Sequence, residues 1–61
     1  MIEVTRLNDK TLIINAELVE TIEATPNTII TTTTGKKIIV KEMVEEVVDL
    51  VIKYKRKITS I

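Results

Sequence analysis

Residues 36–52 read KKIIVKEMVEEVVDLVI, and they contain the change of pattern that decides the fold. Up to Lys41 a short β-branched run is flanked by lysines, which is typical of a strand. From Glu42 onward the apolar residues recur with the 3.6-residue period of a helix. The stripe consists of Val44, Val47, Val48, Val51 and Ile52. We therefore predict a helix over about residues 42–58.

Charges support this helix and its direction. Acidic side chains occupy the predicted first turns, and basic side chains occupy the last turns, so both sets complement the helix dipole. The acidic residues are Glu42, Glu45 and Glu46, and the basic residues are Lys53, Lys55, Arg56 and Lys57. Valine is a mediocre helix former, so the helix should depend on packing its stripe against something. Leu50 and Tyr54 form a second apolar strip beside the first.

The chain before the helix is expected to be β-structure. Eleven Ile, seven Val and ten Thr among 61 residues favour strands. The predicted strands are residues 2–7, 11–15, 18–25, 28–33 and 36–41. The turns between them are predicted at Asn8-Asp9, Pro26-Asn27 and Thr34-Gly35. The prediction is one domain over residues 1–61, mainly β, with a five-stranded antiparallel meander over about residues 2–41 and one C-terminal helix.

The second and fifth predicted strands are apolar on both faces, although one helix can cover only one face. A chain of 61 residues buries only about 60% of the surface that its unfolded form exposes, and it has no cysteine for a disulfide. We therefore expect that the chain forms a homo-oligomer, specifically a dimer, which completes the fold. The alternative is that the short strands twist into a small barrel. The self-association candidates are Leu12, Ile13, Ile14, Ile38, Ile39, Val40, Leu50 and Tyr54.

Composition argues against most kinds of catalytic site. Nine basic and nine acidic residues give a net charge of zero, and the chain has neither Cys nor His. It therefore lacks a thiolate nucleophile, an imidazole base and the usual zinc ligands. We expect no enzyme activity and no catalytic, cofactor or metal site. No apolar run is long enough to span a membrane, and Met1-Ile2-Glu3 starts no signal pattern, so we expect a cytoplasmic protein without membrane insertion.

Two charged groups are the strongest candidate sites. Glu20 and Glu23 are either a carboxylate pair for acid–base chemistry or surface charges. Because they are three residues apart on a predicted strand, their side chains should point to opposite faces. The basic cluster is defined as Lys53, Lys55, Arg56 and Lys57, with Tyr54 among them. It either contacts nucleic acid, anionic lipid or an acidic protein face, or only complements the helix dipole. Arg6 is either an edge charge or a partner contact.

The chain resembles the FlbD family, also called SwrD, over essentially its whole length. The matching segments are MI-x-VTRLN at 1–8, Leu12 through Ala16, ETIEATPNT-x-I at 20–30, GKK at 35–37 and VKE at 40–42. The family often has Gly in place of Asp9, and Ser in place of Met43, so the capping box with Glu46 is lost here.

The FlbD resemblance implies an accessory of bacterial flagellar motility that swarming bacteria need for full motor power. It implies no enzymatic activity, and it places the protein in the cytoplasm, associated with the flagellar base. The expected partners are a second copy of the chain and a flagellar motor protein or a motor-associated protein. The partner-binding candidates are Glu20, Glu23, Thr25, Pro26, Lys53, Lys55, Arg56 and Lys57.

A second resemblance is to CsrA, a strand-swapped dimer that binds RNA. The chain is similar to CsrA in its length, its five predicted strands, its C-terminal helix and Thr5-Arg6. The alternative prediction is therefore a CsrA-like topology with the function of a small dimeric RNA-binding regulator. CsrA-like proteins carry a basic stretch where this chain has Lys41-Glu42-Met43, and an acidic residue there opposes phosphate binding. The chain also has no Phe or Trp for base stacking. We therefore expect no nucleic-acid partner.

Overall fold

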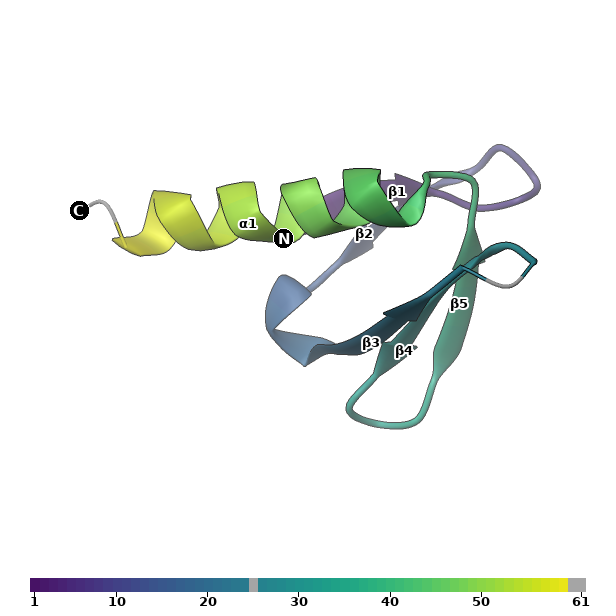
Figure 1. The fold of residues 1–61 in the computed structure, drawn as a ribbon, viewed down its shortest axis with the longest axis horizontal. Coiled ribbons are helices and arrows are strands. Elements are labelled where there is room, and N and C mark those ends of the chain that lie inside the picture. The colour runs from purple at the N-terminus through teal and green to yellow at the C-terminus, as the bar shows by residue number, and fades with distance from the viewer. Residues whose placement is uncertain (25, 60–61) are drawn as a thin grey trace.

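The computed structural model describes residues 1–24 and 26–59, and it is mainly β with one C-terminal helix, as predicted. The antiparallel strands β1 (Ile2–Thr5) and β2 (Thr11–Ile14) form one sheet. The strands β3 (Val19–Glu23), β4 (Thr28–Thr32) and β5 (Lys37–Val40) form a second antiparallel sheet in the order β3-β4-β5. Helix α1 (Val44–Thr59) lies along the β1–β2 hairpin (Figure 1). The five predicted strands are therefore divided between two sheets.

The division occurs because the chain forms a short 3₁₀ helix, η1 (Ala16–Leu18), between β2 and β3. The side chain of Asn15 caps it by accepting a hydrogen bond from the Glu17 N–H at 3.0 Å. Ala16 is buried in the core, which anchors the turn. The sequence prediction treated this segment as a plain connection and began the third strand at Leu18, so η1 was missed.

The two sheets meet again on the opposite side of the molecule. Arg6 and Val40 form an isolated antiparallel bridge, and the Lys41 N–H donates to the Thr5 C=O at 2.8 Å. These contacts place the end of β5 beside the end of β1. The two sheets are joined at this single bridge in the spatial order β2-β1-β5-β4-β3, with β2 and β3 as the outermost strands.

The core is formed by alternate residues of the strands and by one helix residue. In β4 and β5 burial alternates strictly, as expected for strands with one covered face. The buried apolar residues are Ile2, Val4, Ile14, Ala16, Ile30, Ile38, Val40 and Val47. The partly buried residues packed against them are Leu12, Val19, Ile22, Leu50, Val51 and Tyr54.

The helix face that meets the core includes Val47 and Val51 of the predicted stripe but is shifted from it toward Leu50 and Tyr54. Val47 is fully buried, and Leu50, Val51 and Tyr54 pack partly against the core. Val48 and Ile52, which belong to the predicted stripe, are 39% and 43% exposed. Because apolar residues cover about half of the helix circumference, periodicity alone did not identify the edge of the buried face.

The helix also begins later than predicted, at Val44 instead of Glu42. The Glu46 carboxylate accepts a hydrogen bond from the Met43 N–H at 3.1 Å. This is one half of a capping box, which survives because it uses the backbone of residue 43 and not its side chain. Glu42 lies before the helix, and its carboxylate accepts hydrogen bonds from Thr5.

Two predicted turns are confirmed by their backbone angles. Asp9 has φ 68° in the β1–β2 hairpin loop, and Gly35 has φ 84° between β4 and β5. Both lie in the left-handed region, which Asp tolerates and Gly adopts without cost. In the first loop the Asn8 Oδ1 accepts a hydrogen bond from the Lys10 N–H at 3.0 Å, which stabilises the turn itself.

Candidate interaction surface

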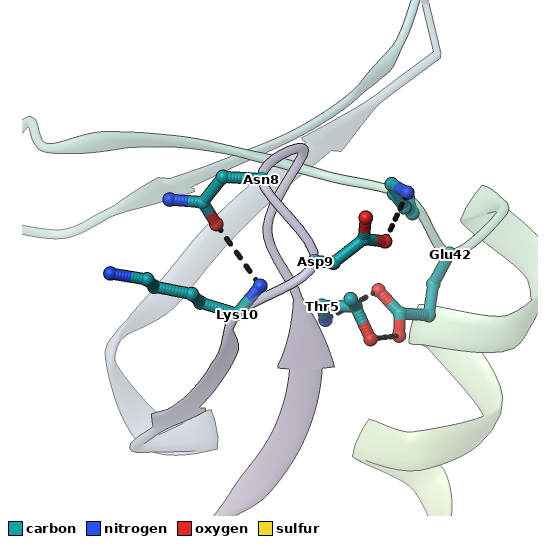
Figure 2. A network of polar contacts seen from close by, with 6 residues as sticks. Thr5, Asn8, Asp9, Lys10 and Glu42 are labelled. Carbon is teal, nitrogen blue, oxygen red and sulfur yellow. Dashed lines mark hydrogen bonds and ion pairs between the residues drawn. The ribbon is translucent and has the colours of Figure 1, made fainter.

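A polar junction joins the first hairpin to the start of the helix (Figure 2). The two oxygens of the Glu42 carboxylate accept hydrogen bonds from the Thr5 N–H and from the Thr5 hydroxyl, both at 2.8 Å. Burial raises the pKa of the Glu42 carboxyl, but the hydrogen bonds from Thr5 lower it more, and the resulting pKa lies below the ordinary value of 4.5. Glu42 is therefore held as a carboxylate by Thr5.

An ion pair lies beside this junction on its exposed side. The Lys41 ammonium donates to the Asp9 carboxylate, so the tip of the hairpin loop is tied to the β5–α1 connection (Figure 2). The two side chains are 46% and 78% exposed, so this pair adds little stability by itself. Together with Thr5 and Glu42 it positions the loop that carries Leu7 against the segment that carries Met43.

An open groove of about 530 Å³ runs past the junction. It brings together three segments that are distant in sequence: the loop after β1, the β3–β4 turn and the first turn of α1. Leu7 and Met43 on its rim are 50% and 64% exposed. The groove residues are Leu7, Ala24, Pro26, Asn27, Thr28, Val40, Lys41, Met43, Val44 and Glu45. Exposed apolar side chains around a groove are a feature of protein interaction sites.

Of the predicted partner-binding residues in residues 20–26, the structure places Pro26 in this groove and Glu20 and Glu23 on the exposed surface of β3. Thr25 lies outside the described residues. A β-bulge between Val19 and Thr21 adds one residue to the strand. Val19 and Ile22 consequently both pack toward the core, although they are three apart. The expectation that Glu20 and Glu23 lie on opposite faces is wrong, because the bulge turns both away from the core.

A family comparison identifies the chain. The model of the family described as "FlbD: Flagellar and Swarming motility proteins" matches residues 1–59. The chain belongs to the FlbD family. The sequence-based resemblance is therefore confirmed, and the groove, the junction and the basic cluster all lie within the matched residues. No curated protein and no solved structure matches the chain.

The basic cluster of this FlbD protein lies at the other end of the molecule from the groove. All four cations are exposed on the last turns of α1, which extends past the strands along the 36 Å axis (Figure 1). Lys53 and Lys57 border a shallow, mostly apolar depression of about 280 Å³ with Met1 and Tyr54. The structure thus separates the two sets of predicted partner-binding residues instead of joining them in one site.

The predicted self-association residues fall into three groups. Ile14, Ile38 and Val40 are in the core of the FlbD chain itself, where they are inaccessible to a partner. Leu12, Leu50 and Tyr54 are half-buried against that core. Ile13 and Ile39 are 56% and 42% exposed. Each doubly apolar strand therefore has one face in the core and one exposed face within the chain.

The described part of the chain contains no helix long and apolar enough to cross a membrane. Nor does that part contain a group of three or more His, Cys, Asp or Glu residues arranged to hold a metal ion. Sequence reasoning missed Leu7 and Met43 as surface residues, because a single apolar residue in a loop carries no periodic signal. It also missed the bond between Thr5 and Glu42, which joins residues 37 positions apart.

Proposed function

We propose that this FlbD-family protein is a non-enzymatic accessory of bacterial flagellar motility, and that it supports motor power by binding another protein. The observation that carries the proposal is the family match over residues 1–59. A binding role is supported by the groove at the hairpin–helix junction and by its exposed rim residues Leu7 and Met43. The chain has no Cys or His, so the common nucleophile–base pairs cannot be built from it.

The proposed site of action is the cytoplasmic side of the flagellar base, with a motor protein or a motor-associated protein as the partner. The molecule offers two separate surfaces for it. One is the groove with Pro26 and the adjoining exposed surface of β3, which carries Glu20 and Glu23, and the other is the basic cluster on the last turns of the helix. The opposite charges of β3 and of the basic cluster suit a partner with complementary charges, whose association would slow as salt increases.

The test is deletion of the gene followed by complementation. The deletion strain should assemble flagella but show reduced swarming and reduced torque, measured by flagellar staining and by rotation of tethered cells. A strain without flagella would contradict the proposal, because it would indicate a role in assembly and not in motor power.

Complementation with charge-reversed variants tests the two surfaces. Glu20→Lys with Glu23→Lys, and Lys53→Glu with Lys57→Glu, should each lower torque. All four side chains are exposed, so the free energy of unfolding should change by about 0.5 kcal/mol or less per site. The control is Lys36→Glu with Lys37→Glu, which reverses two exposed charges at the β4–β5 turn that belong to neither predicted set. Full torque in both surface variants would exclude these surfaces as the point of contact.

A further inference from the structure

The outer edge of β2 carries unpaired backbone N–H and C=O groups, and the register of the β1–β2 hairpin shows to which residues they belong. The Arg6 N–H donates to the Lys10 C=O at 2.8 Å, so Arg6 and Lys10 occupy a hydrogen-bonding position of the ladder. In an antiparallel ladder hydrogen-bonded pairs alternate with non-hydrogen-bonded pairs, whose N–H and C=O groups point away from the partner strand. The register makes the pairs of Glu3 with Ile13 and of Thr5 with Thr11 the non-hydrogen-bonded ones.

The contacts of Thr5 agree with this assignment. Its N–H donates to Glu42 and its C=O accepts from the Lys41 N–H, both at 2.8 Å and both away from β2. The N–H and C=O groups of Thr11 and Ile13 must therefore point outward at the free edge of β2. Within the part of the chain that the structure describes, no other segment hydrogen-bonds to them. Thr11 and Ile13 are both exposed, so the edge is accessible.

The outer edge of β3 is protected against pairing, and the outer edge of β2 is not. β3 carries the bulge at Glu20, and both Glu20 and Glu23 project from its surface. Bulges and charges are the devices by which proteins prevent strand edges from pairing with other chains. β2 reads Thr-Leu-Ile-Ile, with no charge, no proline and an unbroken register. An exposed edge of this kind is a template for another strand.

We propose that two copies of the chain pair antiparallel through the outer edges of β2 and so form a continuous sheet in the order β1-β2-β2-β1. With the two-fold axis at Leu12, Thr11 of each copy lies opposite Ile13 of the other. In this register all the outward N–H and C=O groups of Thr11 and Ile13 are paired, because donors and acceptors alternate equally along the edge. This self-complementarity of the edge favours a second copy of the chain over a strand from a different protein.

Side chains support the same register. The Leu12 residues of the two copies become direct neighbours in a non-hydrogen-bonded pair, where side chains approach most closely. Leu12 is half-buried against the core, so the pairing joins the two cores. On the outer face Ile13, which is 56% exposed, lies next to Thr11 of the second copy. The proposal limits self-association to β2, whereas the sequence had also suggested the fifth strand.

Light scattering after size-exclusion chromatography tests the proposal. At about 100 µM, where an interface with a micromolar Kd is saturated, the wild type should have twice the 6.9 kDa mass of one chain. Ile13→Lys should have the mass of one chain, because a lysine on the outer face beside the edge disfavours pairing. Ile39→Lys is the matched control, since Ile39 is similarly exposed but lies on β5 and not at the β2 edge, and it should keep the double mass.

Hydrogen exchange provides a second measurement that needs no variant to fold. The amides of Thr11 and Ile13 should be protected from exchange at high concentration. Their protection factors should fall about tenfold when the dimer dissociates on dilution. The amides of Leu12 and Ile14 point toward β1 and should change less. A wild type with the mass of one chain, a dimer that persists in Ile13→Lys, or exchange at Thr11 and Ile13 that is independent of concentration would each overturn the proposal.

Discussion

Replacing Glu42 with alanine should measure how strongly the polar junction holds the hairpin to the helix. The substitution removes two hydrogen bonds to a carboxylate, from the Thr5 N–H and the Thr5 hydroxyl, each at 2.8 Å. A hydrogen bond to a charged group contributes about 1.5–3 kcal/mol, but Glu42 is only half-buried, and solvent replaces part of the lost interaction. We expect a loss of about 2 kcal/mol in the free energy of unfolding.

This loss should be visible as a change in thermal stability. For a domain of this size 1 kcal/mol shifts the Tm by about 4–8 °C, so Glu42→Ala should lower the Tm by about 10 °C. Glu42→Gln keeps an acceptor oxygen but loses the charge, and it should cost about half as much. The control is Glu45→Gln, a neighbouring and exposed carboxylate at the helix start, which should cost about 0.5 kcal/mol through the helix dipole alone.

The pH dependence gives an independent check on the same residue. The folded pKa of Glu42 lies below the ordinary value of 4.5, so the folded state binds its proton less readily than the unfolded state does. The stabilisation is therefore complete above pH 4.5 and is lost as the pH falls through the folded pKa. The Tm difference between wild type and Glu42→Gln should shrink over this interval. Equal Tm values for Glu42→Gln and Glu45→Gln at neutral pH, or a difference that grows on acidification, would refute the assigned role.

Two further predictions concern the core and nucleic acid. Ile30 is 0% exposed and Ile39 is 42% exposed, so Ile30→Val should lower the free energy of unfolding by about 1 kcal/mol in denaturant titrations, while Ile39→Val should leave it nearly unchanged. RNA binding should be weak at physiological salt in gel-shift assays, with a slope of log K against log[salt] no steeper than about −3, because the basic cluster supplies four cations. Nanomolar, sequence-selective binding would instead favour the CsrA-like alternative.

Features set by neighbouring residues could be predicted from the sequence. The β-branched runs predicted the strands, and Asp9 and Gly35 marked turns that need positive φ. The features that were missed depend on contacts between distant segments. Glu42, which was predicted to begin the helix, binds Thr5 instead, and the faces of Glu20 and Glu23 changed because a bulge in β3 altered the alternation. Local periodicity carries no information about either event.

The doubly apolar strands show why the face that meets the core was also beyond prediction. Period two requires Ile38 and Ile39 to point to opposite faces, but two isoleucines give no reason to choose between them. The choice follows from the bridge between Arg6 and Val40, which sets β5 beside β1 with Val40 and Ile38 inward.

The same arrangement makes the two exposed isoleucines different in what they can bind. Ile39 lies on β5, which is bridged to Arg6 at the next residue, Val40, and which carries the exposed charge of Lys37 that disfavours pairing with another strand. Ile13 has an outward N–H and C=O at the uncharged edge of β2. Backbone pairing is directional and needs a specific register, whereas apolar side-chain contact does not. Ile13 can therefore specify both the orientation and the alignment of a second chain.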